Sequence, residues 1–209
     1  MCADFSCSFC SANVFGIKGI LDMNVYDFDG TIYRGDSTVD FYFFCLFRYP
    51  LMIFSVPVQF WGMVSYKAGR IDKTQMKSYF FSFLKKVKKK DEIIQKFWKK
   101  NIKKIYAWYR NQQEEDDVII SASPEFLLQP VCNQLGIKNL VASEVDLSTG
   151  KFLGKNCYGE EKIRRFQEAY GAKAEIQNFY SDSISDLPMA QMAAKAFFCR
   201  KGERKRWEI

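Results

Sequence analysis

The fold of this chain is decided by a stretch near its start, Asn24-Val25-Tyr26-Asp27-Phe28-Asp29-Gly30-Thr31. Residues 24–26 predict a short buried strand, and Gly30-Thr31 predicts a polar turn directly after it. The carboxylates of Asp27 and Asp29 therefore lie two residues apart at the end of a strand. Such a pair taken alone is more often a turn or a helix cap than a site, so its role depends on the rest of the chain.

The rest of the chain alternates between strand and helix patterns. Residues 118–120 predict a second buried strand that ends at Ser121. A helix follows, in which Ser123 is the expected N-cap, Pro124 the first residue and Gly136 the end. Further strands are predicted at 140–142, 178–180 and 196–198, a hairpin at 144–153, and helices at 160–170 and just after residue 182. This alternation predicts an α/β fold with a Rossmann-like three-layer core, in which helices cover both faces of a parallel sheet.

An inserted segment separates the first two strands. Residues 36–100 show long helical periodicities and no strand alternation, which predicts an all-helical cap domain. The expected organisation is a disordered or mis-assigned leader at 1–22, a catalytic core of 23–35 and 101–199, the cap at 36–100, and a charged tail at 200–209. Met23 directly precedes the first strand, so we expect it to be the true initiator.

The composition narrows the chemistry. The chain has 209 residues and no histidine, which excludes Ser-His-Asp hydrolases, phosphohistidine enzymes and His-ligated zinc sites. Its seven cysteines are odd in number and mostly scattered, and the amino terminus does not resemble a secretory signal, so a cytoplasmic protein is expected. Acid–base chemistry then falls mainly to carboxylates that work with a hard metal ion.

Four polar clusters follow predicted strands or begin a helix: Asp27 with Asp29, Ser121, Lys162, and Asp182 with Asp186. The carboxyl ends of parallel strands share one edge of a sheet, so these clusters can converge. Four carboxylates crowded together need a divalent cation, and Mg²⁺ prefers oxygen ligands. Ser121 and Lys162 can then hold the anionic oxygens of a phosphoryl group, assisted by backbone amides at the helix near Pro124.

In type and order these clusters resemble the four motifs of the haloacid dehalogenase superfamily: Asp27-Phe28-Asp29-Gly30-Thr31, Ser121, Lys162, and Asp182-Ser183-Ile184-Ser185-Asp186. The insertion resembles the helical cap of the phosphoserine phosphatase-like branch. The resemblance covers about Met23 to Phe198. One departure is Ser181, which stands where many relatives have glycine.

This resemblance implies a Mg²⁺-dependent phosphomonoester hydrolase that acts on a small molecule. Asp27 would be the nucleophile that forms an aspartyl-phosphate, and Asp29 would protonate the leaving oxygen and then activate water. The metal ligands would be Asp27, the backbone carbonyl of Phe28, and Asp182, with Asp186 acting directly or through water.

The same resemblance assigns the remaining residues. Ser121 and Lys162 would bind the transferring phosphoryl group. An aspartate at position 29 favours phosphatases and phosphomutases over dehalogenases and transport ATPases. Asp36 lies where phosphoserine phosphatases have a glutamate that meets the substrate's amino group. It is equally suited to be the N-cap of the first cap helix, and both interpretations stay open.

The cap segment is basic and aromatic. Between Tyr66 and Arg110, fifteen Lys or Arg stand against three Asp or Glu, a net +12 in a chain of +7. Residues 93–108 predict an amphipathic basic helix, which either contacts an anionic membrane surface or forms a solvated face. Residues 41–64 are very apolar, but charged, proline and amide residues interrupt them, which predicts cap helices rather than a membrane span. Their aromatic side chains form cap packing or a pocket for a lipid-like phosphate.

Several functions share these features. A phosphotransferase or mutase would use the same aspartyl-phosphate, and a lipid-phosphate phosphatase would associate with membrane surfaces through the basic aromatic cap. A binding module for lipid or nucleic acid with vestigial catalytic residues is a further alternative. All the expected carboxylates are present, however, so the phosphatase is preferred and nucleic acid is not an expected partner.

Overall fold

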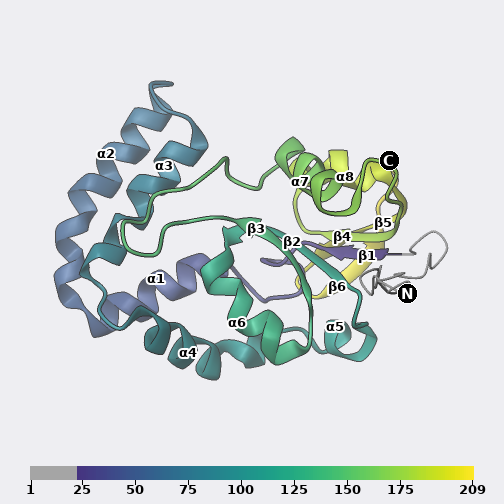
Figure 1. Cartoon of the computed structure of the whole chain (residues 1–209), viewed down its shortest axis with the longest axis horizontal. Helices are drawn as coiled ribbons and strands as arrows, with labels where there is room; N and C mark the ends of the chain where they lie inside the picture. Colours follow the sequence, from purple (N-terminus) through teal and green to yellow (C-terminus); the bar gives the residue numbers. More distant parts are fainter. Residues whose placement is uncertain (1–22) are drawn as a thin grey trace, which may run out of the picture.

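The computed structural model describes residues 23–209, and a six-stranded sheet forms its centre (Figure 1). Its strands are β1 (Met23–Tyr26), β2 (Val118–Pro124), β3 (Asn139–Ser143), β4 (Ile176–Ser181), β5 (Ala193–Arg200) and β6 (Glu203–Arg206). The order is β3-β2-β1-β4-β5-β6, and β1 to β5 pair in parallel. The predicted α/β core is therefore confirmed. The leader and initiator predictions for residues 1–22 lie outside the described residues.

Helices cover both faces of this sheet (Figure 1). One face carries α7 (Glu160–Tyr170) and α8 (Leu187–Met192), and the other carries α5 (Ala107–Gln112) and α6 (Glu125–Leu135). Alternate residues of β1 separate two apolar clusters, since Val25 packs beneath α7 and α8 while Tyr26 packs on the side of α5 and α6. This two-sided burial explains the consecutive apolar residues 118–120 at the start of β2, which lies inside the sheet.

The insertion after β1 is helical throughout. It contains α1 (Ser37–Arg48), η1 (Pro50–Ser55), α2 (Val56–Lys67), α3 (Lys73–Phe80), η2 (Phe81–Lys86), α4 (Lys90–Asn101) and η3 (Ile102–Lys104), where η marks a short 3₁₀ helix. The carboxylate of Asp36 accepts a hydrogen bond from the Val39 amide at 2.9 Å and starts α1. The carboxylate of Asp72 and the side chain of Gln75 form a capping box at the start of α3.

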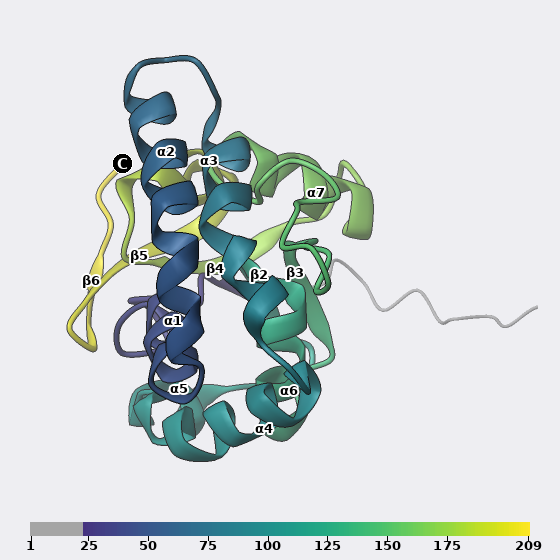
Figure 2. The ribbon, with the colours of Figure 1, turned by 90° about the vertical axis from the view of Figure 1, so that its left-hand side faces the viewer.

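The insertion is not packed as one unit. Aromatic residues of α1 and α4, among them Phe41 and Phe97, belong to the same apolar cluster as Leu127 and Leu128 of α6. The indole of Trp98 also donates a hydrogen bond to the Leu127 carbonyl at 2.6 Å. By contrast, α2 and α3 pack against each other and project away from the sheet (Figures 1 and 2).

Two details differ from the sequence predictions. The segment expected to be a charged tail contains β6, which pairs antiparallel with β5 at the edge of the sheet. All four residues of β6 are charged and exposed, as suits an edge strand. The basic helix predicted over 93–108 is instead divided among α4, η3 and the start of α5, and in α4 the apolar residues Ile93, Ile94 and Phe97 are buried in the core. Only its lysine side faces solvent, which favours the solvated-face interpretation. None of the helices in residues 23–209 combines the length and the apolar character that crossing a bilayer requires.

Candidate active site

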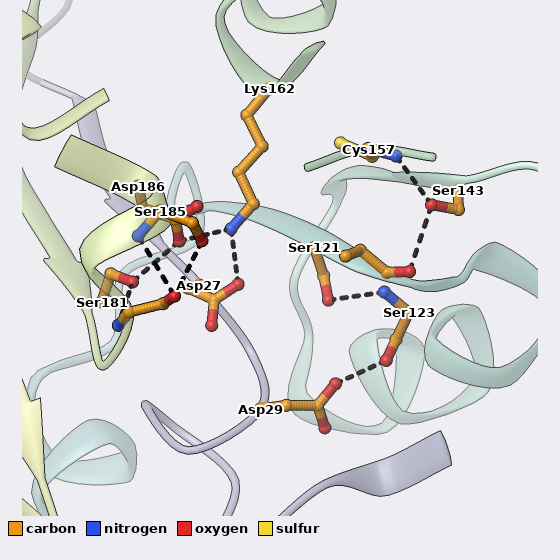
Figure 3. Close-up of polar contacts among 12 residues, drawn as sticks. Asp27, Asp29, Ser121, Ser123, Ser143, Cys157, Lys162, Ser181, Ser185 and Asp186 are labelled. Carbon is orange, nitrogen blue, oxygen red and sulfur yellow. Dashed lines mark hydrogen bonds and ion pairs between the residues drawn. The ribbon is translucent and has the colours of Figure 1, made fainter. Parts of the chain in front are cut away.

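The structure brings the four predicted polar clusters to one edge of the sheet (Figure 3). Asp27 directly follows β1, and its backbone amide donates to the Tyr180 carbonyl of β4 at 2.9 Å. Lys162 reaches down from α7 and lies between two carboxylates. Its ammonium is 2.7 Å from Asp27 Oδ1 and 2.6 Å from Asp186 Oδ2. The lysine that the motif order selected in the sequence is therefore fully buried at the centre of the site.

Burial and charge oppose each other in this ion-paired group. Burial lowers the pKa of the Lys162 ammonium, but the carboxylates of Asp27 and Asp186 raise it further, so its net pKa lies above the ordinary value. Burial raises the pKa of Asp27 to about 7, although the positive charge of Lys162 lowers it. Two of the three ammonium hydrogens of Lys162 are engaged, which leaves one donor for an anionic ligand.

A chain of hydroxyl groups holds the second aspartate. The Ser123 hydroxyl donates to Asp29 Oδ2 at 2.5 Å, and the Ser121 hydroxyl accepts from the Ser123 amide at 3.1 Å (Figure 3). The amide of Ser37 donates to Asp29 Oδ1 at 2.6 Å. Burial and Asp36 raise the pKa of Asp29 to about 6, while these hydrogen bonds lower it. Within the described residues the Ser121 hydroxyl donates no hydrogen bond, so its hydrogen can point into the site.

Ser123 is a site residue that the sequence did not identify. We predicted that it caps α6, but the N-cap position is occupied by Pro124 and no side chain caps that helix. The Ser123 hydroxyl instead contacts Asp29 and the hydroxyl of Thr38. A serine before proline is a common helix start, so the local pattern could not reveal a partner that lies 94 residues away in sequence.

The loop after β1 bears on one predicted metal ligand, the backbone carbonyl of Phe28. The carbonyl oxygen of Phe28 accepts hydrogen bonds from the amides of Ile32 and Tyr33, at 3.1 and 2.9 Å, and Phe28 is fully buried. Both hydrogen bonds lie inside the turn and occupy the lone pairs of that oxygen, which favours another carbonyl of this loop as a metal ligand. The carbonyl of the next residue, Asp29, accepts none of the backbone hydrogen bonds of this turn within residues 23–209.

Gly30 explains how Asp182 approaches this loop. Gly30 has a φ of +74°, and a Cβ added to it would lie 1.9 Å from Asp182 Oδ2. Only glycine fits both this backbone conformation and this contact. Burial and the charge of Asp186 raise the pKa of Asp182, whose carboxylate accepts no side-chain hydrogen bond from the described residues.

These residues line a cavity of about 560 Å³ between the sheet edge and the insertion. Two lysines of α3 also line it. Lys77 donates to the Ala122 carbonyl at 2.9 Å and to Asn156 Oδ1 at 2.8 Å, and burial, with the charge of Lys73, lowers its pKa to about 8. Lys73 lies over the ring of Tyr158, 3.1 Å from its centroid. The sequence placed both lysines in a long basic run and gave no sign that they face the site.

Asp36 lies at the mouth of this cavity and is also the N-cap of α1. The structure thus brings it beside the site while giving it the structural role that was one of its two interpretations. Whether it also contacts a substrate stays a prediction.

The fold and the site together define a class: α/β proteins with a carboxylate-rich pocket between a parallel sheet and a helical insertion after its first strand. Within that class, the chain belongs to the haloacid dehalogenase-like hydrolase family, whose model matches residues 25–191. The matched range begins in β1 and ends in α8, so it includes every residue of the four clusters.

Individual relatives are more distant. The chain is 37% identical over 87 residues to "Probable phosphatase Rv3661" of Mycobacterium tuberculosis (strain ATCC 25618 / H37Rv), a match that covers 39% of this chain and 30% of that protein. A Bordetella pertussis Tohama I protein of unknown function superimposes with a TM-score of 0.66 at 18% identity, covering 83% of this chain and 87% of that one. A substrate-bound phosphoserine phosphatase superimposes with a TM-score of 0.56 at 14% identity, covering 84% of both chains. At these identities the structural matches show a shared fold.

Proposed function

We propose that this protein is a phosphatase that hydrolyses small-molecule phosphomonoesters through a phosphorylated Asp27. The observation that carries the proposal is the position of Lys162, whose buried ammonium joins Asp27 to Asp186 at the bottom of the cavity. Such a fixed cation beside a carboxylate nucleophile stabilises the charge on a transferring phosphoryl group. The family membership and the name of the mycobacterial relative support the same activity.

The proposed steps use the geometry of the site. A carboxylate oxygen of Asp27 attacks phosphorus, and the bond from phosphorus to the leaving oxygen breaks. Asp29 donates its proton to that oxygen and then removes a proton from the water that cleaves the aspartyl-phosphate. The remaining donor of Lys162 and the hydroxyl of Ser121 bind the phosphoryl oxygens. A pKa of about 6 for Asp29 suits a group that both donates and accepts a proton near neutral pH.

We further propose Mg²⁺ as the cofactor, which is general among phosphatases of this family. The available donors are oxygens alone, which fits a hard cation. As the side chains lie, no three acidic or cysteine residues among the described residues converge as a ready metal cluster. Asp27 and Asp182 are the proposed ligands, and the free carbonyl of Asp29 replaces that of Phe28. Asp186, which is held by Lys162 and Ser181, supports the ion through water. When bound, Mg²⁺ neutralises charge on the phosphoryl group.

The substrate side of the cavity favours anions. Lys73 and Lys77 add two positive charges opposite the carboxylates, while Val39, Met76 and Phe80 supply an apolar wall. Candidate substrates differ in how they would contact the lysines and the apolar wall; examples are phosphoserine, phosphorylated sugars and lysophosphatidic acid. A phosphotransferase or mutase remains an alternative, because it needs the same residues and differs only in the acceptor of the phosphoryl group.

The first experiment is hydrolysis of p-nitrophenyl phosphate by the full chain with Mg²⁺ and with EDTA. Turnover should require Mg²⁺ and should be lost in Asp27→Asn, while Asp91→Asn, at an exposed position in the first turn of α4, should behave like the parent. Equal phosphate release by the parent and Asp27→Asn would refute the proposal. Adding glycerol as an acceptor separates the alternatives, since a transferase would form glycerol phosphate instead of releasing phosphate.

A further inference from the structure

The outer helix of the insertion, α2, has small or polar residues on its inner side and large apolar residues on its exposed side. Its residues toward α3 and the rest of the protein are small or polar, namely Ser55 at its N-cap, Gln59, Gly62 and Ser65. Gln59 is fixed by hydrogen bonds to the Phe80 carbonyl and from the Tyr42 hydroxyl, at 2.9 and 3.1 Å. A Cβ on Gly62 would lie 2.5 Å from Tyr79, so the two helices are in close contact there. In a water-facing helix the pattern is the reverse.

The opposite side of α2 and the preceding η1 expose large apolar side chains. Phe60 is 68% exposed, Trp61 57% and Phe54 70%. Thirteen of the eighteen large exposed hydrophobic residues in the described chain lie between 39 and 66, so this exposure is concentrated in one segment. We call its centre the outer apolar face, formed by Leu51, Ile53, Phe54, Phe60, Trp61, Met63 and Val64. Figure 2 shows α2 on the side of the molecule away from the sheet. Patches of this kind mark an interaction surface.

The charges around this face indicate its partner. The sequence from Phe41 to Ile71 contains no acidic residue, whereas Arg48, Lys67 and Arg70 are all present and exposed. The whole insertion, residues 36–100, holds thirteen Lys or Arg and five Asp or Glu, so its net charge of +8 exceeds the net +7 of the whole chain. A second copy docked symmetrically on this face would bring like charges together. An anionic lipid surface supplies the opposite charge.

We propose that the outer apolar face docks on the surface of an anionic lipid bilayer. Twelve residues of α2 extend about 18 Å, well short of the roughly 30 Å of a bilayer core, so the helix lies in the interface and does not cross it. Phe60 and Trp61 enter the region between headgroups and acyl chains, and Lys67 and Arg70 contact lipid phosphates. The surface is separate from Asp27 and its partners, so this proposal does not depend on the proposed activity.

Binding is tested by sedimentation of the full chain with vesicles of phosphatidylcholine, alone or with about 30% phosphatidylglycerol. We expect salt-sensitive binding to the anionic vesicles and little to the neutral ones. Trp61 is the single exposed tryptophan of the four, so its emission should shift to the blue on binding. The double variant Phe60→Ser/Trp61→Ser should lower the partition coefficient by about tenfold or more. Lys67→Glu/Arg70→Glu should lower it by a similar factor at low salt.

Two matched variants control for general effects. Leu153→Ser removes a side chain that is 69% exposed outside the face, and Lys205→Glu reverses a charge on β6; neither should change binding. Phosphatase turnover and thermal unfolding of every variant show whether the fold is intact. No binding to anionic vesicles at low salt, or equal binding by Phe60→Ser/Trp61→Ser, would overturn the proposal. A concentration-dependent dimer that the double variant abolishes, without vesicle binding, would assign the face to a second copy instead.

Discussion

Removing Lys162 tests the electrostatic core of the site. In Lys162→Met the aliphatic stem is replaced at similar volume, but the carboxylates of Asp27 and Asp186 lose an ammonium at 2.7 and 2.6 Å. All three groups are buried, and leaving buried charges without their partner costs about 3–5 kcal/mol. For a chain of this length that loss lowers the melting temperature by roughly 6–20 °C. The measurement is thermal and urea unfolding in EDTA, so that no cation substitutes for the lysine.

The pH dependence of this loss has a defined sign. With Lys162 present, burial already holds the pKa of Asp27 at about 7, and removal of the ammonium raises that pKa further. A carboxyl group with a raised folded-state pKa loses stability as pH rises, because ionisation is then unfavourable in the fold. Below about pH 7, protonation of Asp27 relieves part of the loss, because a neutral carboxyl group does not need the ammonium. The difference between Lys162→Met and the parent should therefore widen from pH 7 upward, by at most about 1.4 kcal/mol per pH unit for each carboxyl group.

Three comparisons separate the loss of this ion pair from other causes of instability. Lys173→Met, at an exposed position, should unfold like the parent. The double variant Lys162→Met/Asp186→Asn should be more stable than Lys162→Met, because one of the two uncompensated charges is gone. Mg²⁺ should raise the melting temperature of Lys162→Met, since the site then has more unbalanced negative charge. Unfolding free energies for Lys162→Met within about 1 kcal/mol of the parent from pH 6 to 9 would refute the reasoning.

Three further predictions concern the residues around this pair. Ser123→Ala removes a hydrogen bond to the Asp29 carboxylate, which raises the pKa of Asp29 and should shift the pH–rate profile for p-nitrophenyl phosphate to higher pH by about one unit. Ser123→Thr should restore the parent profile, and an unchanged profile in Ser123→Ala would contradict the contact. Gly30→Ala and Gly69→Ala both strain a positive φ, which costs about 1 kcal/mol of stability, but only a Cβ at position 30 also clashes with Asp182. Gly30→Ala should therefore lose more stability than Gly69→Ala, and activity should fall only in Gly30→Ala; equal activities would show that the contact is unimportant. Asp36→Asn should keep the N-cap of α1, whereas Asp36→Ala should lower the free energy of unfolding by about 1 kcal/mol. If KM rises in Asp36→Asn for phosphoserine but not for p-nitrophenyl phosphate, Asp36 contacts an amino group of the substrate. Unchanged KM values would show that Asp36 is a helix cap alone.

The sequence by itself determined the sheet, the position of the insertion and the side chains at the carboxyl edge. These follow from short-range patterns, because a buried strand that ends in polar residues is visible in three or four consecutive positions. The same local patterns failed where one residue fits two roles. Ser123 has the pattern of a helix cap, so its hydrogen bond to Asp29 could not be inferred. The carbonyl of Phe28 has no feature in the sequence that shows its hydrogen bonds to the turn amides.

Which lysines of the insertion line the site, and which of its faces exposes apolar side chains, could be known only from the tertiary structure. Lys77 and Lys96 are alike in a basic run. Lys77, however, is half-buried and donates to the Ala122 carbonyl, whereas Lys96 pairs with Glu92 in solvent. Helix α2 is apolar around most of its circumference, so its sequence could not predict that Gly62 and Ser65 would face inward. Both outcomes depend on contacts between residues far apart in the chain. Those contacts form only when the helices pack, so they leave no local pattern in the sequence.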